Sequence, residues 1–147
     1  MTTILTHSFR INRHQARFAD ERGYFQELFH SHKYPDGVQF DRGVIPQVSI
    51  SSSKRGVLRG MHCSDYPKLV TVVHGAVYDV IVDLREHSST FRKWCAVVVS
   101  CENQRQLFIP AGCGHGFLCL EDCKMLYLQG GCFDPPRELD VSPFDLT

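Results

Sequence analysis

The chain has 147 residues, of which 43% are hydrophobic, and this size and composition suit one compact domain with its own core. We therefore expect a single domain over residues 1–147. Lysine plus arginine (16) balance aspartate plus glutamate (16), so the net charge gives no electrostatic reason to expect a nucleic acid or a membrane surface as a partner.

The N-terminal residues have no basic stretch followed by a long apolar run, and no window of the chain approaches the length of a membrane span. We expect a soluble, cytoplasmic protein. The seven cysteines are odd in number, form no Cys-x-x-Cys pair and lie mostly within apolar segments. Buried, reduced thiols are therefore favoured over a disulfide framework.

The first forty residues show little periodicity, and residues 30–36 suit either a short helix or a loop. From about Ser49 to Tyr127 a period of two dominates, with Gly, Pro or Asn at hairpin-like intervals. We predict three pairs of strands, at residues 69–74 with 76–83, 94–100 with 106–109, and 117–120 with 124–128, and a turn at residues 110–114. Many short strands in one small domain predict an all-β jelly-roll barrel with little helix, whose open end can hold a small ligand.

Two histidines lie beside glycines at the ends of strand-like runs: His62 follows Arg59 and Gly60, and His115 precedes Gly116. With Lys68 and a tyrosine such as Tyr127 they supply a base, an acid and a cation for an oxyanion, which together suit proton transfer beside a carbonyl. Taken singly, each of these side chains equally suits a structural role.

The spacing of histidines and cysteines raises two other kinds of site. His30 and His32 have the His-x-His spacing of a metal site, but no carboxylate accompanies them, so a solvated pair is favoured. Cys63 adjoins His62 and Cys113 lies two residues before His115, yet neighbouring residues of a strand point to opposite faces, which disfavours a Cys-His nucleophile at Cys63. Any phosphate binding would be local, with Arg22 and Arg59 as the first candidates.

A run of motifs across residues 18–136 closely resembles the dTDP-4-dehydrorhamnose 3,5-epimerase family. The motifs are 20–25 (DERGYF), 53–62 (SKRGVLRGMH), 67–70 (PKLV), 77–85 (VYDVIVDLR), 89–91 (STF), 105–110 (RQLFIP) and 115–117 (HGF). The resemblance implies a cupin-type jelly roll without metal or other cofactor, usually a homodimer. Its substrate would be a nucleotide-linked 4-keto-6-deoxyhexose of the dTDP-rhamnose pathway, inverted at C3 and C5.

The resemblance also implies roles for individual residues. His62 would be the general base, Tyr127 the proton donor on the opposite face of the sugar, and Lys68 the group that stabilises the enolate. The residues implied to line the sugar and nucleotide site are Arg22, Phe25, Glu27, Gln47, Arg59 and His115.

The family also has an aspartate that orients the base histidine, and three residues compete for that role here: Asp79, Asp140 and Asp145. Cys132 and Phe133 stand where the family commonly has tyrosines, and Leu128 replaces a usual lysine, so base stacking and substrate choice are expected to differ. A single-carbon epimerase or ketoisomerase of the same fold, and a sugar-nucleotide-binding protein without catalysis, remain alternatives.

Overall fold

The structure is a computed structural model that describes residues 3–4, 10–12, 17–30 and 45–142. Its strands are β1 (Thr3–Ile4), β2 (Arg10–Asn12), β3 (Arg17–Asp20), β4 (Gly23–Gln26), β5 (Gln47–Ser53), β6 (Leu58–Cys63), β7 (Lys68–His74), β8 (Ala76–Asp83), β9 (Trp94–Ser100), β10 (Gln106–Ile109), β11 (Cys113–Cys119), β12 (Cys123–Gln129) and β13 (Leu139–Asp140). Within these ranges the helical part is one 3-10 turn, η2 (Pro135–Arg137), and no helix is long and apolar enough to cross a membrane.

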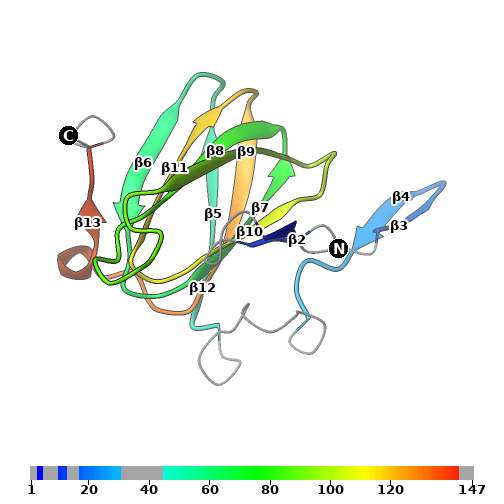
Figure 1. The fold of residues 1–147 in the computed structure, drawn as a ribbon. Helices are drawn as coiled ribbons and strands as arrows, with labels where there is room; N and C mark the ends of the chain where they lie inside the picture. The colour runs from blue at the N-terminus through cyan, green and yellow to red at the C-terminus, as the bar shows by residue number, and fades with distance from the viewer. Residues whose placement is uncertain (1–2, 5–9, 13–16, 31–44, 143–147) are drawn as a thin grey trace.

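Two antiparallel sheets face each other (Figure 1). The six-stranded sheet has the order β1-β2-β10-β7-β12-β5, and the five-stranded sheet has the order β13-β6-β11-β8-β9. This arrangement confirms the predicted all-β jelly roll with little helix. The single domain expected over residues 1–147 stays a prediction.

The predicted strands exist, but their predicted pairing is wrong. Strand β7 pairs with β10 and β12, whereas β8, which follows it in the chain, pairs with β9 and β11 in the other sheet. Each expected hairpin is instead a connection that crosses from one sheet to the other. The cause is that β7 and β8 each bury apolar side chains on the same core, which a flat hairpin cannot enclose.

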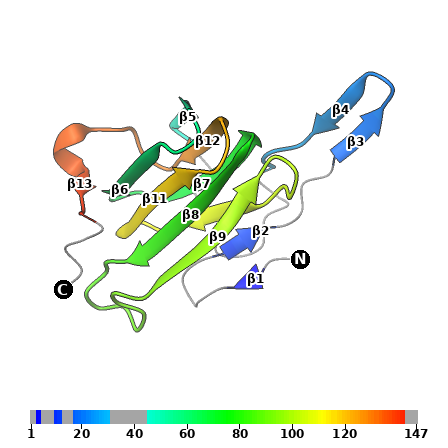
Figure 2. The same cartoon turned by 90° about the horizontal axis from the view of Figure 1, so that it is seen from above.

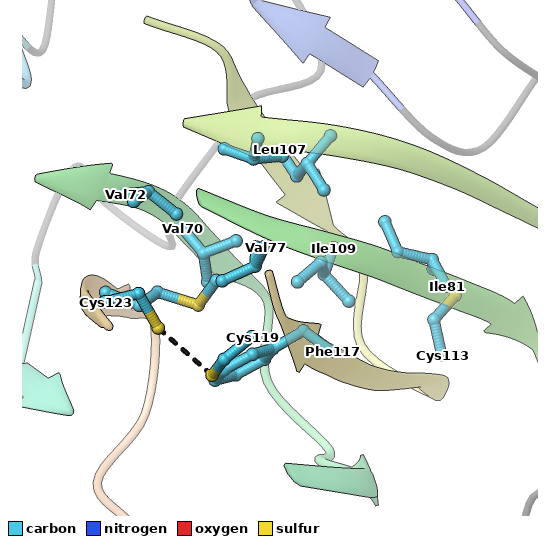
Figure 3. Close-up of a cluster of buried hydrophobic side chains, with 12 residues drawn as sticks. Val70, Val72, Val77, Ile81, Leu107, Ile109, Cys113, Phe117, Cys119 and Cys123 are labelled. Carbon is cyan, nitrogen blue, oxygen red and sulfur yellow. Dashed lines mark hydrogen bonds between the residues drawn. The ribbon is translucent and has the colours of Figure 1, made fainter. Parts of the chain in front are cut away.

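A core of twelve buried side chains fills the space between the sheets (Figure 3). The six-stranded sheet contributes Val70, Val72, Leu107, Ile109, Cys123 and Met125, and the five-stranded sheet contributes Val77, Ile81, Val99, Cys113, Phe117 and Cys119. Each fully buried aliphatic side chain stabilises the fold by about 1.5–3 kcal/mol relative to an exposed one. All seven cysteines are free thiols.

The turn predicted over residues 110–114 is too long, because β11 begins at Cys113 and carries His115 in its middle. The turn itself is confined to residues 111–112, and two glycines outside it, Gly60 and Gly116, permit close approach of two strands. A side chain on Gly60 would collide with Gly116 and the carbonyl of His115, and Gly60 has a φ of +109°, which favours glycine. These two glycines therefore allow β6 and β11 to pack tightly beside His62 and His115.

Strands β3 and β4 form a separate hairpin that extends away from the two sheets (Figures 1 and 2). Sequence periodicity did not reveal it. Three of its aromatic side chains are largely exposed: Phe18 by 64%, Tyr24 by 56% and Phe25 by 70%. Most of the segment that suited either a helix or a loop, residues 31–36, lies outside the described residues.

Candidate active site

A cavity of about 350 Å³ opens between the two sheets, a volume typical of small-ligand sites. Its walls come from β5, β7 and β12 of one sheet and from β6 and β11 of the other. The lining residues are Gln47, Ser49, Ile50, Ser51, Arg59, His62, Tyr66, Lys68, His115, Phe117, Tyr127, Gln129, Phe133 and Glu138. The structure thus brings together six of the predicted site residues: Gln47, Arg59, His62, Lys68, His115 and Tyr127.

The two histidines lie side by side on one wall of the cavity. His62 on β6 and His115 on β11 are Cα partners in the five-stranded sheet. His115 is 5% exposed, and its Nε2 lies 3.0 Å from Oδ2 of the fully buried Asp79. Burial raises the pKa of Asp79, and His115 opposes that rise. Asp79 is therefore engaged by His115 and does not orient His62.

His62 has its own carboxylate partner, Asp140. The His62 Nδ1 lies 2.6 Å from Oδ1 of Asp140, because β13 pairs with β6 and sets these two residues opposite each other. An acceptor at Nδ1 fixes the ring and leaves Nε2 to exchange protons. Of the three acids considered from the sequence, Asp140 is the one that contacts His62, while Asp145 lies outside the described residues.

The facing wall carries Tyr127 on β12 and Lys68 on β7. The phenol of Tyr127 lies 3.0 Å from the Ser51 hydroxyl on β5. Burial raises the pKa of Tyr127 to about 12, so its phenol is protonated at neutral pH. Burial also lowers the pKa of Lys68, and the nearby Glu138 opposes that change.

Two further polar residues, Arg59 and Gln47, line the cavity. The Arg59 guanidinium donates a hydrogen bond of 2.7 Å to the Ser53 hydroxyl. The Gln47 side chain accepts a hydrogen bond of 2.8 Å from the backbone N–H of Phe133, an exposed ring on the cavity lining. An arginine, an amide and an aromatic ring thus line the same cavity. An arginine suits recognition of a phosphate, and an aromatic ring suits recognition of a base.

Arg22, Phe25 and Glu27 are not part of this cavity within one chain. Arg22 and Phe25 belong to the β3–β4 hairpin or its turn, and Glu27 follows β4 directly. Arg22 forms an exposed ion pair with Asp20. Their predicted contact with substrate stays a prediction.

The cysteines near the histidines are poorly suited to nucleophilic attack. Burial raises the pKa of Cys63, and it raises the pKa of Cys113 to about 12, so both thiols are neutral at physiological pH. His62 lines the cavity whereas Cys63 is buried. In the other alternative, the His30–His32 metal pair, His32 lies outside the described residues.

The sequence did not single out several residues of the site. Glu138, Tyr66, Ser51 and Gln129 all line the cavity. Glu138 follows the 3-10 turn and has no periodic or motif signal of its own. Only its contacts across the fold reveal it, through hydroxyl groups of the β6–β7 connection.

Comparison with known proteins points in one direction. Residues 7–147 match the family model described as dTDP-4-dehydrorhamnose 3,5-epimerase. A dTDP-4-dehydrorhamnose 3,5-epimerase of Streptomyces griseus is 43% identical over 133 residues, covering 87% of this chain and 66% of the relative. The chain thus spans just under two thirds of that relative's length.

Two solved structures have the same fold. An epimerase of Mycobacterium tuberculosis superposes with a TM-score of 0.89 at 31% identity, covering 99% of this chain and 74% of the other. A 3'-monoepimerase of Streptomyces bikiniensis in complex with dTDP-quinovose gives a TM-score of 0.88 at 31% identity, covering 99% and 75%. Similarity extends over nearly all of this chain in both cases.

Proposed function

Because the chain belongs to the dTDP-4-dehydrorhamnose 3,5-epimerase family, we propose that it inverts C3 and C5 of a dTDP-linked 4-keto-6-deoxyhexose. The observation that carries this proposal is the cavity whose two walls hold His62 and Tyr127, each from a different sheet. Inversion needs a base on one side of a carbon and an acid on the other. A protein that only bound the sugar would need neither.

The ketone at C4 makes the neighbouring C–H bonds acidic. His62 removes a proton from C3 or C5, the electron pair left on that carbon forms a double bond to C4, and the C4=O π pair moves onto the oxygen to give an enolate. The Lys68 ammonium stabilises the negative oxygen in a cavity where burial strengthens the interaction. Tyr127 then donates a proton to the opposite face, and the ketone re-forms with the carbon inverted. Before the next inversion, His62 gives its proton to solvent and the Tyr127 phenolate takes a proton from solvent.

Each role is supported by a local contact. Tyr127 is a proton donor because its raised pKa keeps the phenol protonated, and Ser51 holds its hydroxyl. Asp140 keeps the His62 ring in one orientation through Nδ1. The reaction moves protons without changing the oxidation state of the sugar, so the proposed steps need no redox cofactor.

The nucleotide part of the substrate needs donors for a diphosphate and a surface for a base. Arg59 supplies the first, since a guanidinium forms paired hydrogen bonds with phosphate oxygens. Phe133 and Gln47 also line the cavity, where the Phe133 N–H donates to the Gln47 side chain. His115, held by Asp79, is proposed to contact the sugar.

We further propose a homodimer in which the β3–β4 hairpin of one chain completes the cavity of the other. Exposed aromatic clusters of this kind are typical of interfaces. Strand β5 is an edge strand beside the cavity, and Val48 and Ile50 on it are each 60% exposed. Docking of the hairpin there would cover both surfaces and bring Arg22, Phe25 and Glu27 toward the substrate.

The cellular location is proposed from the thiols. All seven cysteines are free, and free thiols persist in the reducing cytoplasm. We therefore propose that the enzyme works there.

The test is to incubate the protein with a dTDP-linked 4-keto-6-deoxyglucose in heavy water and to follow the sugar protons by NMR. The proposal predicts deuterium at both C3 and C5 and a change of configuration at each. Unlabelled sugar that is nevertheless bound would mean a binding protein without catalysis, and a product with the keto group moved would mean a ketoisomerase.

A single-carbon epimerase is the second candidate, favoured by the similarity to the S. bikiniensis 3'-monoepimerase. The same experiment separates the two. Label at C3 alone would replace the double inversion by the single one.

A further inference from the structure

Glu138 is a buried carboxylate beside the lysine of the proposed active site. Its side chain is 8% exposed, and its Oε2 lies 3.9 Å from Nζ of Lys68, which is 12% exposed. The Ser64 hydroxyl donates to Oε2 and the Tyr66 hydroxyl donates to Oε1, each over 2.6 Å. Gln129 in turn donates to the Tyr66 oxygen over 3.0 Å, so the carboxylate belongs to a connected network.

The distance between the Glu138 carboxylate and the Lys68 ammonium indicates how these two groups interact. A charge-assisted hydrogen bond between an ammonium and a carboxylate is typically about 2.7–2.9 Å long, so 3.9 Å lies beyond hydrogen-bond distance. The two groups attract each other electrostatically, yet the carboxylate does not take up an N–H of Lys68. The hydroxyl groups of Ser64 and Tyr66 each donate to one of the carboxylate oxygens and hold the carboxylate in place.

Because Lys68 is buried, the nearby charge of Glu138 affects the protonation state of the lysine. Desolvation lowers the pKa of Lys68, which would favour a neutral amine that cannot stabilise an enolate. Glu138 raises that pKa. The Tyr66 ring lies 5.6 Å from Nζ and also favours the cation. The other titratable groups that line the cavity are Arg59, His62, His115 and Tyr127.

The segment from Glu138 to Asp140 supplies one carboxylate near Lys68 and another at His62. Glu138 directly precedes β13, and Asp140, two residues further along, contacts His62. Residues two apart on an extended chain point to the same side. Strand β13 lies along the edge of the five-stranded sheet beside β6, which Figure 1 shows.

We propose, on the basis of the function proposed above, that Glu138 is a positioning residue that keeps Lys68 in its ammonium form while leaving its N–H groups free for the ketone oxygen. Ser64 and Tyr66 make this division possible, because they restrain the carboxylate. In this proposal Lys68 contacts the substrate, and Glu138 acts on the reaction through Lys68.

The test is Glu138→Gln, which removes the charge and keeps the shape. The Lys68 titration is followed by NMR of its side-chain amine in the unliganded protein, with Lys68→Arg to assign the signal, and kcat is measured from pH 6 to 10. We expect the Lys68 midpoint and the alkaline limb of kcat to move together to lower pH. The loss of kcat relative to the unchanged protein should be on the order of tenfold greater at pH 9 than at pH 7.

Ser64→Ala is the matched variant, because it keeps the charge and removes one restraint. We expect the freed carboxylate to approach Lys68, so that the lysine titrates at higher pH and kcat falls at all pH values. This variant also decides the question if Glu138→Gln does not fold. A fall in the Lys68 midpoint in Ser64→Ala would overturn the proposal.

An unchanged Lys68 titration in a folded, active Glu138→Gln protein would overturn this inference alone. Absence of turnover by the unchanged protein would instead overturn the proposed function. The NMR titration does not depend on turnover, so the two failures are distinguishable.

Discussion

His62 and Asp140 are Cα partners across strands β6 and β13, and their side chains meet with Nδ1 of the histidine 2.6 Å from Oδ1 of the aspartate. Both side chains are accessible, His62 by 55% and Asp140 by 85%. Water therefore weakens the electrostatic part of the contact, and its main effect is on the orientation of the ring.

Asp140→Asn tests that orientation. The amide keeps the size but can also present an N–H to Nδ1, which would favour the wrong tautomer. We expect kcat to fall about ten- to a hundredfold with little change in KM, because a misplaced base loses its near-attack geometry. Steady-state kinetics measure this, with Asp122→Asn as a control at an exposed aspartate outside the cavity. Equal kcat in the two variants would exclude Asp140 from the mechanism.

His62→Asn removes the proposed base. We expect a loss in kcat on the order of a hundred- to ten-thousandfold, the usual contribution of a positioned general base. Binding of dTDP, measured by isothermal titration calorimetry, should be preserved, because Arg59 and Gln47 remain. His74→Asn, at an exposed histidine at the end of β7, is the control. Full turnover by His62→Asn would assign the base to another residue.

Tyr127→Phe removes the proposed acid and leaves the base in place. We expect C3 and C5 to exchange with deuterium while their configuration is retained, because His62 can return a solvent deuteron only to the face it took the proton from. NMR of the sugar in heavy water measures both. Inversion at the normal rate would contradict the assignment, and Tyr78→Phe, on the outer side of β8, should behave as the unchanged protein.

The pKa of Tyr127 makes proton donation by its phenol depend on pH. Because this pKa is raised to about 12, the donor function is present below that pH and is lost only as pH rises through it. Any loss of kcat between pH 8 and 10 should therefore arise from groups other than Tyr127. The pH of that loss is compared with the midpoint of the Lys68 titration measured by NMR.

Phe25→Glu tests the proposed dimer. Phe25 is 70% exposed on the hairpin, and a charge at a buried interface position is strongly unfavourable. We expect the unchanged protein to be a dimer by light scattering coupled to gel filtration, and Phe25→Glu to be a monomer with raised KM. Leu120→Glu, in the exposed turn between β11 and β12, is the control. A variant that remains dimeric with unchanged KM would remove the hairpin from the interface.

Asp83→Asn tests a structural ion pair outside the lining of the cavity. Asp83 is fully buried, and Arg85 donates two hydrogen bonds to it, over 2.8 and 2.7 Å. Burial alone would raise the pKa of Asp83, but hydrogen bonds from Arg85, Ser88 and Thr90 outweigh burial and hold it well below the usual range. We expect the substitution to lower the free energy of unfolding by about 3 kcal/mol at pH 7, measured with urea.

The pH dependence of that difference follows from the direction of the change. A lowered folded-state pKa gives stability that is present above the unfolded-state value, about 3.9, and is lost as pH falls toward the folded-state value. The gap between the two proteins should therefore narrow below about pH 4. A constant gap down to pH 2 would show that the Asp83 charge is not the cause.

The sequence determined the local features of this protein. A period of two specifies strands and their inner faces, so the observed bounds of β8, β9 and β10 coincide with the predicted ones. The glycine-flanked histidines of the sequence, His62 and His115, lie on one wall of the cavity, where Gly60 and Gly116 allow β6 and β11 to approach closely.

Tertiary structure alone decided how those strands pair and which carboxylate serves which group. Periodicity states which face of a strand is apolar, but not which sheet covers it, so β7 and β8 were wrongly paired with each other. Asp79 engages His115, Asp140 contacts His62 and Glu138 approaches Lys68 through contacts between residues 36 to 78 positions apart. Such contacts arise when the sheets close on their shared core, and no local pattern of residues encodes them.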